Sequence, residues 1–335
     1  MPIINQIVKG SGGSAPAHYI KKTVDANGKL TNSNNIIDLT GVTEIGGIGT
    51  LAQQYAGVTF PNNTTIDLSG ILTITGTNCC ASTFASATKI TSVNLSSLTS
   101  ITGSGVCESM FNGISTITSI NLNSLTTING NRPCVSMFSF CSCLTSINFP
   151  ALTTINGTSA CQSMFQQDTT ITSVNFSELV TISGTGACQN MFMSCFGLTS
   201  IDFPKLTTLS ENGCCSSMFL NCNSLQSVSL NKLNTISSQI SQSYAVMFGG
   251  CTKLESVNFG GLKASTFANA QNQIQYLFNN ITGSQAPNGC TIHFPSNFDP
   301  ADPNHTFDAS TLTGYPTFGG SSSYIHVAFD LPATE

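Results

Sequence analysis

A short motif returns along this chain at a fixed interval. It begins with Cys, has Ser or Asn at its third position and ends in Phe, and its six copies lie at 80–84, 107–111, 134–138, 161–165, 188–192 and 215–219. Successive phenylalanines are 27 residues apart, five times in a row, without insertion or deletion. A fixed period of roughly 20 to 50 residues marks repeat architectures, in which each unit buries its apolar face against the next. The sequence therefore predicts a solenoid rather than a set of globular domains.

The first part of each unit alternates in the manner of a β-strand. Ile147 and Phe149 are separated by one polar residue, and the other units repeat this spacing, which is typical of a strand with one buried face. Leu152 and Ile155 are the next apolar positions, and Gly157 then marks a turn. Stacked in register, such strands form a parallel ladder with about 4.8 Å between neighbours. We expect one such sheet along one side of the solenoid.

The second part of each unit has the spacing of a short helix. Cys161, Met164, Phe165 and the residue three positions later fall at i, i+3, i+4 and i+7, which is the spacing of one helical face. Each unit is therefore predicted to be a strand, a turn, a short helix and a return. Less regular rungs are expected at 37–39, with Tyr55 in the phenylalanine column, and at 257–259, with Phe278 in that column. We expect the last strand at 292–294.

Ten of the fourteen cysteines follow the repeat, in two columns, rather than an irregular disulfide pattern. One column, four residues before each phenylalanine, is always Cys, whereas the column three residues after it accepts Cys, Ala, Ile and Asp. Free cysteine packs as a small apolar residue, so we expect both columns to be buried and reduced. The predicted structural core comprises Phe111, Phe138, Phe165, Phe192, Phe219, Cys107, Cys134, Cys161 and Cys188.

Disulfides and zinc are the alternatives for these cysteines. Stacking brings the Cα atoms of neighbouring rungs within disulfide range, and the pairs at 79–80 and 214–215, with Cys-Ser-Cys at 141–143, resemble clustered ligands. Structural zinc sites, however, usually combine Cys-x-x-Cys pairs with further cysteine or histidine. This chain has no Cys-x-x-Cys pair, and no histidine lies between residues 19 and 292. We therefore predict no metal and no cofactor.

The chain carries unusually little charge. Charged residues make up 7% of it, against about 25% in a typical soluble protein, and the ten Lys and Arg are scattered. Nucleic-acid binding needs clustered basic residues, so we expect no nucleic-acid partner. No apolar run is long enough to span a bilayer, and residues 1–13 lack the pattern of a secretory signal. A composition rich in hydroxyls and amides is common on extracellular and virion surfaces.

The unit at 137–155, MFSFCSCLTSINFPALTTI, resembles the BspA-like class of leucine-rich repeats, with its Cys, its L-T-S-I step and the apolar strand that follows. The resemblance covers roughly 37–294, and departs from the class in the Met before Phe and in the added upstream Cys. It implies a parallel β-solenoid used for binding, on bacterial, parasite or phage surfaces, without catalysis. The predicted fold is a leucine-rich-repeat-like α/β repeat solenoid with a parallel β ladder of about ten rungs of 27 residues, plus irregular N- and C-terminal segments.

Three segments follow from these patterns. We predict an N-terminal attachment or capping segment at 1–36, the leucine-rich repeat solenoid at 37–286 and a C-terminal capping segment at 287–335. The stretch at 4–30 is similar to the N-termini of tail or accessory structural proteins in phages of Gram-positive hosts. This resemblance implies attachment to other virion subunits through the N-terminal segment.

The polar residues between the inward apolar ones define a candidate binding face, which is the concave sheet face in leucine-rich repeats. It consists of Asn94, Asn121, Asn148, Asn175, Asp202, Ser119, Ser146 and Ser173. One interpretation is a lattice that solvates the sheet; the other is a surface for a neutral polar ligand such as a glycan, whose hydroxyls suit planar amides. Threonine columns raise the possibility of ice binding, but Val180 and Gln226 interrupt them.

We predict no catalytic residues. The four histidines lie outside the regular rungs, and no nucleophile has a base at a recognisable spacing. Asp168, Glu178, Asp202 and Glu211 are the acids available for glycoside hydrolysis, which needs two carboxylates across a cleft. The predicted function is a non-enzymatic structural protein of a phage virion surface that binds other subunits and a host-surface protein or glycan. The alternatives are a bacterial cell-surface adhesin and a glycan-acting enzyme.

Overall fold

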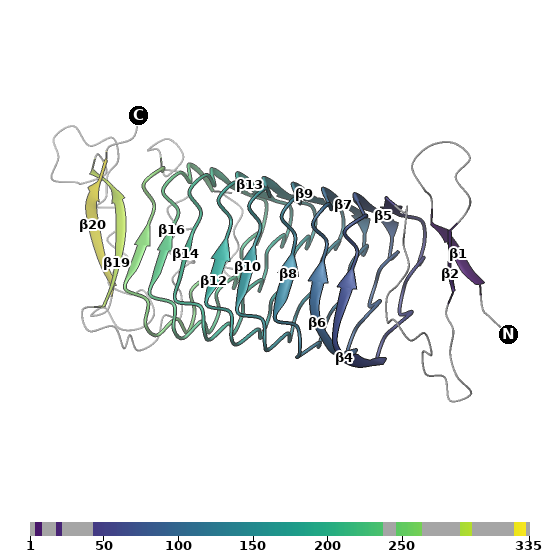
Figure 1. Ribbon diagram of the computed structural model, residues 1–335. Coiled ribbons are helices and arrows are strands. Elements are labelled where there is room, and N and C mark those ends of the chain that lie inside the picture. Colours follow the sequence, from purple (N-terminus) through teal and green to yellow (C-terminus); the bar gives the residue numbers. More distant parts are fainter. Residues whose placement is uncertain are drawn as a thin grey trace.

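The computed structural model describes residues 4–8, 18–21, 43–236, 246–262, 289–296 and 325–332. These residues form a β-solenoid, in which the chain winds repeatedly around one core and the rungs stack in sequence order from β4 to β20 (Figure 1). The predicted repeat solenoid is thus confirmed. Each rung passes through two strands and then a series of turns before it reaches the next rung.

The first strand of each rung belongs to a parallel ladder that we call the Ser–Asn ladder, after its outward residues. Its register pairs each residue with the one 27 positions further on in the regular rungs, as Asn148 does with Asn175. The strands fall into runs of three, two and five, and β8 and β10, like β12 and β14, remain in contact across the breaks. They are β4 (Thr59–Asp67), β6 (Thr88–Asn94), β8 (Ser119–Asn121), β10 (Ser146–Asn148), β12 (Ser173–Asn175), β14 (Ser200–Asp202), β16 (Ser227–Ser229), β18 (Ser256–Asn258), β19 (Cys290–Pro295) and β20 (Ile325–Leu331).

A second parallel ladder corrects the expectation of a single sheet on one side. We call it the Thr ladder, because Thr leads most of its strands, and in the described residues it contains eight strands in one continuous sheet. These are β3 (Glu44–Ile45), β5 (Thr73–Thr77), β7 (Ser100–Ser104), β9 (Thr127–Asn129), β11 (Thr154–Asn156), β13 (Thr181–Ser183), β15 (Thr208–Ser210) and β17 (Thr235–Ile236). Its three-residue strands bury one side chain each, Ile155 in β11, so the sequence contains no alternation by which to recognise them.

The predicted short helices are wrong. Residues 158–167, which include the Cys-x-Ser-Met-Phe motif, form consecutive turns. Backbone N–H groups alternate between two uses: that of Met164 donates to the Cys161 carbonyl within the rung at 3.2 Å, whereas that of Phe165 donates to the Met191 carbonyl of the next rung at 2.9 Å. Ser163 has a φ of 55°, which a right-handed helix does not allow. Every second backbone N–H in this segment therefore donates to the next rung and is not available for a hydrogen bond within a helix.

The core is built from stacked columns of identical side chains. From Tyr55 to Phe248 the rings of the phenylalanine column lie 5.2 to 5.8 Å apart between neighbours, with nearly parallel planes. Phe149, Phe176 and Phe203 form a second stack behind the Ser–Asn ladder, at 5.3 and 5.5 Å. Phe111, Phe138, Phe165, Phe192, Phe219, Cys107, Cys134, Cys161 and Cys188 are all fully buried.

Glycine at the end of most Thr-ladder strands lets neighbouring rungs touch backbone to backbone. Gly157 has a φ of 113°, and a β-carbon on it would collide with the carbonyl oxygen of Gly130 in the preceding rung. The same contact recurs between Gly130 and Gly103 and between Gly184 and Gly157. Glycine is favoured at this position, because a β-carbon would meet the neighbouring backbone and because the φ angle is positive. Glu211 holds the equivalent position after β15, also at a positive φ of 77°.

The two ends depart from the regular rungs. Near the N-terminus, β1 (Ile4–Val8) and β2 (His18–Lys21) form an antiparallel pair. At the other end, β19 carries the predicted strand at 292–294, but β20 pairs parallel to it, so this is not the last strand. In the described residues the Thr ladder gives about eight turns and the Ser–Asn ladder contains ten strands, against about ten rungs predicted. The rung expected at 37–39 and the predicted place of Phe278 lie outside the described residues.

Candidate binding face on the Ser–Asn ladder

The structure places all eight predicted face residues on the strands of the Ser–Asn ladder. Asn148, Asn175 and Asp202 are exposed and lie in three consecutive rungs, whereas Asn94 and Asn121 are half-buried. Ser119, Ser146 and Ser173 are exposed in the column two residues earlier. The strands that carry them are short and in register, so the face is a regular grid of hydroxyls and amides with Asp202 near one end.

Most asparagines of this face use their side chains to hold the backbone that follows. The Oδ1 atom of Asn175 accepts a hydrogen bond from the backbone N–H of Ser177 at 2.9 Å, and Asn94 and Asn121 make the same contact two residues on, each at 3.2 Å. Such Asx turns fix the direction of the chain after a strand. The hydrogen bonds to the following turn are therefore enough to explain why these positions are asparagine.

Asn148 and Asp202 differ because proline lies two residues after each of them. Pro150 and Pro204 have no N–H to donate, so neither side chain can form the Asx turn. Asn148 Oδ1 instead accepts a hydrogen bond from Asn175 Nδ2 at 2.7 Å, which leaves the Asn148 amide donors toward solvent. The Asp202 carboxylate makes no hydrogen bond to any part of the chain that the structure describes. The sequence signal for this difference is the proline, whose consequence we did not infer from the sequence.

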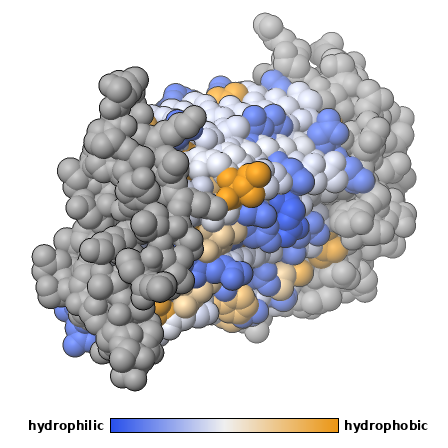
Figure 2. All heavy atoms as spheres, turned by 90° about the vertical axis from the view of Figure 1, so that its right-hand side faces the viewer, coloured by the Kyte–Doolittle hydropathy of each residue, from blue (hydrophilic) through white to orange (hydrophobic). Residues whose placement is uncertain are grey.

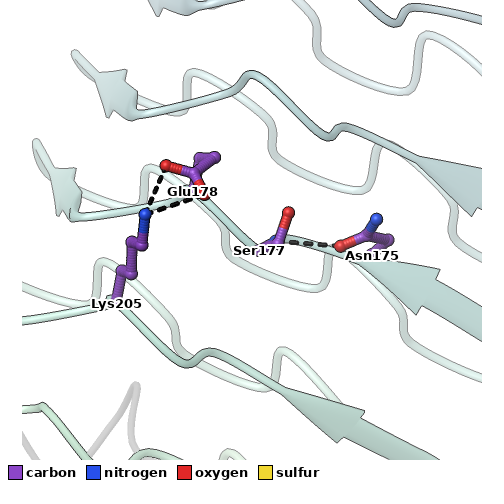
Figure 3. A network of polar contacts seen from close by, with 4 residues as sticks. All are labelled: Asn175, Ser177, Glu178 and Lys205. Atoms are coloured by element: carbon purple, nitrogen blue, oxygen red, sulfur yellow. Dashed lines mark hydrogen bonds and ion pairs between the residues drawn. The ribbon is translucent and has the colours of Figure 1, made fainter.

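The exposed Asn148, Asn175 and Asp202, in three consecutive rungs, form a polar row that we call the strip. An ion pair borders it. Lys205 Nζ lies 2.6 and 2.8 Å from the two carboxylate oxygens of Glu178, which sits three residues after Asn175 in the preceding rung (Figure 3). Both side chains are about half exposed, so the pair contributes little to stability. The two charges of the pair, which are the closest in sequence to the strip, neutralise each other. Asp202 is then the charged residue of the strip itself.

The Thr ladder is also polar, and the threonines that directly precede its strands use their hydroxyls in hydrogen bonds. Thr153 Oγ1 donates to the Thr126 carbonyl of the preceding rung at 3.1 Å, and Thr99, Thr126 and Thr207 make the equivalent bond. Each hydroxyl adds to a backbone N–H that already donates to the same carbonyl, as Thr153 N–H does to the Thr126 carbonyl at 2.9 Å. These hydroxyls are therefore used between rungs and do not form a free lattice. In Figure 2 most of the coloured surface is pale or blue and orange is confined to small patches, as expected for faces of Ser, Thr and Asn.

The cysteine columns lie inside the solenoid, away from this face. Every cysteine in the part of the chain that the structure describes is a free thiol, and all but Cys143 are buried. Burial raises the pKa of the Cys222 thiol to about 12, and the thiols of Cys195, Cys222 and Cys251 each donate to the carbonyl of a phenylalanine in the preceding rung. Neutral thiols used as donors are poor metal ligands, because metals bind the thiolate.

Two of the acids named for glycan hydrolysis, Asp168 and Glu178, are already buried or paired. Asp168 is fully buried and Glu178 is bound to Lys205, which leaves neither as a free partner for Asp202. His293, on β19, has its Nδ1 atom 2.8 Å from an oxygen of Asp330 on β20. Within the described ranges, no group of three or more His, Cys, Asp or Glu side chains is arranged to hold a metal ion.

Comparisons with known proteins give a likeness among solved structures. No protein-family profile and no curated protein matches the sequence. Among solved structures, a leucine-rich repeat protein from Bacteroides ovatus is similar, with 17% identity over 90% of this chain and 79% of that chain and a TM-score of 0.35. Because the sequence identity and the TM-score are both low, the fold assignment rests on the ladders and buried columns described above. The described residues contain no helix of the length and hydropathy that crossing a membrane requires.

Proposed function

We propose that this protein is a non-enzymatic binding protein, and that Asn148 and Asp202 on the Ser–Asn ladder bind a neutral, polyhydroxylated ligand such as a glycan. The observation that carries the proposal is the pair of prolines, Pro150 and Pro204, that frees two side chains in an otherwise self-satisfied column. A stable fold has no need of this exception, since the neighbouring rungs are capped through Asx turns.

The chemistry of the strip is complementary to adjacent hydroxyl groups. Asn148 offers amide donors, and the Asp202 carboxylate can accept hydrogen bonds from two neighbouring hydroxyls. Ser146 and Ser173 lie beside them and can donate or accept. Because the rungs recur at about 4.8 Å, the strip presents polar groups at regular intervals along the stack. A polymer of hydroxylated units fits such a series better than a compact charged ligand does.

We further propose that the solenoid displays this strip on the surface of a phage virion. The composition, with 7% charged residues, and the resemblance of residues 4–30 to structural proteins of phages support this location. In this arrangement the N-terminal segment contacts other virion subunits and the solenoid faces a host-surface protein or glycan. A bacterial cell-surface adhesin is the competing assignment and would use the same strip.

Binding is tested with an array of purified neutral bacterial polysaccharides and the full-length protein. The variant Asp202→Ala and the variant Asn148→Ala should each lose most of the binding, while retaining the circular dichroism spectrum of the parent. Asn156→Ala is the matched control, because Asn156 is an exposed asparagine on the Thr ladder, and it should bind as the parent does. Equal loss in the control, or full binding by both strip variants, would contradict the assignment of the strip.

The location is tested separately. Mass spectrometry of purified phage particles should detect the full-length chain at a fixed ratio to the other structural proteins. Detection in the cell envelope of uninfected bacteria would reject the virion assignment and favour the adhesin, without bearing on whether the strip binds a glycan.

A further inference from the structure

One rung in the middle of the solenoid carries a carboxylic acid where its neighbours carry a thiol. Asp168 lies three residues after Phe165, in the column that holds Cys141 in the preceding rung and Cys195 in the following one. Its side chain is fully buried. A lone carboxylate in such a position is expensive, because burial removes the water that stabilises its charge.

The cysteines of this column share one hydrogen-bonding role. Cys141 Sγ donates to the Phe111 carbonyl at 3.4 Å, and Cys195 Sγ donates to the Phe165 carbonyl at 3.2 Å. The thiol of each rung thus donates to the phenylalanine carbonyl of the rung before it. By the same register, the residue at 168 stands opposite the carbonyl of Phe138.

Asp168 makes a different hydrogen bond from the one that the cysteines of its column make. Its Oδ1 atom accepts a hydrogen bond from the backbone N–H of Cys141 at 2.6 Å. In other rungs the equivalent N–H donates within its own rung, as that of Cys195 does to the Phe192 carbonyl at 3.1 Å. The second oxygen of Asp168, Oδ2, is buried and has no hydrogen-bond partner. The rung therefore contains one acceptor too many for as long as the carboxyl group is ionised.

We propose that Asp168 is held as a neutral carboxylic acid in the folded protein, with its Oδ2 hydroxyl donating to the Phe138 carbonyl as the thiols do in neighbouring rungs, and that its ionisation loosens the centre of the solenoid. Protonation turns the unpartnered acceptor into a donor and restores the pattern of the column. The stability of this rung then depends on pH through Asp168, in a chain in which only 7% of the residues are charged.

The electrostatic surroundings agree with this geometry. Burial raises the pKa of Asp168 to about 8, and the N–H of Cys141 opposes this shift only in part. The titratable groups that face it are the thiols of Cys141 and Cys195, whose own pKa values are raised by burial and by Asp168. These thiols stay neutral over the range in which Asp168 titrates, so the pH response belongs to Asp168.

The sign of the effect follows from linkage. Because the pKa of Asp168 is raised in the folded state, the folded protein keeps a proton that the unfolded chain loses above about pH 4. The stabilising contribution of the neutral acid is complete below that value, and it is lost as the pH rises to about 8. Above this pH Asp168 is ionised in both states and the contribution changes no further.

The test compares the full-length protein with two variants. In Asp168→Asn the amide keeps the shape of the neutral acid, accepts from Cys141 and donates to Phe138, but does not titrate. In Asp168→Cys the column regains its usual residue, which provides a second measurement if the Asn variant does not fold. Between about pH 5 and pH 8 the Tm of the parent should fall relative to both variants by on the order of 3 °C per pH unit.

An infrared measurement reports the protonation state directly. At about pH 6 the folded parent should show the carbonyl band of a protonated carboxylic acid, and Asp168→Asn should lack it. Parallel Tm profiles for the parent and both variants, or the absence of that band in the folded parent at this pH, would overturn the proposal.

Discussion

The two ladders are built from nearly the same residues, yet they use them differently. Directly before the Thr-ladder strands, hydroxyls such as that of Thr153 donate to the preceding rung, and after these strands glycines such as Gly157 bring the backbones into contact. On the Ser–Asn ladder the polar groups mostly hold the turn that follows their own strand, and Asn148 and Asp202 do not do even this. A polar surface is therefore not a binding site by itself. The side chains that the fold leaves unused are the ones available to a ligand.

The largest expected effect concerns the glycine contact of the Thr ladder. Gly157→Ala places a β-carbon against the Gly130 carbonyl at a backbone angle that alanine avoids. We expect a loss of more than about 4 kcal/mol in the free energy of unfolding, measured by denaturant titration. Gly57→Ala is the control, since Gly57 also has a positive φ but nothing lies within 4 Å of its added carbon. A similar loss in both variants would show that backbone strain, not the contact between rungs, governs the Thr ladder.

The next effect concerns the phenylalanine column of the core. Phe165 stacks between Phe138 and Phe192 and also meets Phe149, behind the Ser–Asn ladder. Phe165→Ala should leave a cavity and lower the free energy of unfolding by about 3–5 kcal/mol, measured by denaturant unfolding. An unchanged transition midpoint would mean that the ladders, rather than the ring column, hold the rungs together.

A smaller effect separates the two ladders directly. Thr153→Val removes the hydroxyl that donates to the Thr126 carbonyl while keeping the shape of the side chain, and should lower the free energy of unfolding by about 1 kcal/mol. Asn148→Ala removes an amide whose donors point to solvent, so its effect should stay within about 0.5 kcal/mol. If Asn148→Ala were the more destabilising of the two, the strip would be structural and the comparison of the ladders would fail.

The smallest effect is expected at the border of the strip. Lys205→Ala breaks the ion pair with Glu178, which is half exposed, so the free energy of unfolding should fall by no more than about 1 kcal/mol at low salt. The difference should shrink in high salt, because added ions screen exposed charges. Glycan binding should persist in this variant, since the ion pair flanks the strip without belonging to it.

The sequence predicted the stack but misassigned part of its local structure. The spacing of Cys161, Met164 and Phe165 identified residues that are indeed buried, yet it was interpreted as a helix. Consecutive turns produce the same inward spacing, and the choice between them depends on whether an N–H such as that of Phe165 finds its acceptor within the rung or in the next one. That acceptor is 26 residues away, beyond the reach of any local pattern.

The candidate site was partly visible in the sequence. Alternation around Ile147 placed Asn148 and its equivalents on the outer face, as the structure has them. Which of them are unused required the hydrogen bonds: Asn175 and Asn148 look equivalent in the repeat, but Ser177 caps the first and Pro150 cannot cap the second. The role of Asp168 was hidden for a similar reason, because its column appeared to accept any small residue.

By itself, the sequence determined the period, the buried columns and the outward polar rows, since each of these depends on which residues recur at a fixed interval and on the side of a strand they occupy. Only the tertiary structure decided that there are two ladders, that turns replace helices, and that Asp168 has a buried oxygen without a partner. The physical reason is that stacking brings together donors and acceptors that lie 24 to 30 positions apart in the sequence, and these form hydrogen bonds between rungs. Each backbone N–H can donate to a carbonyl in its own rung or to one in the next rung. Which of the two it bonds depends on how the rungs pack.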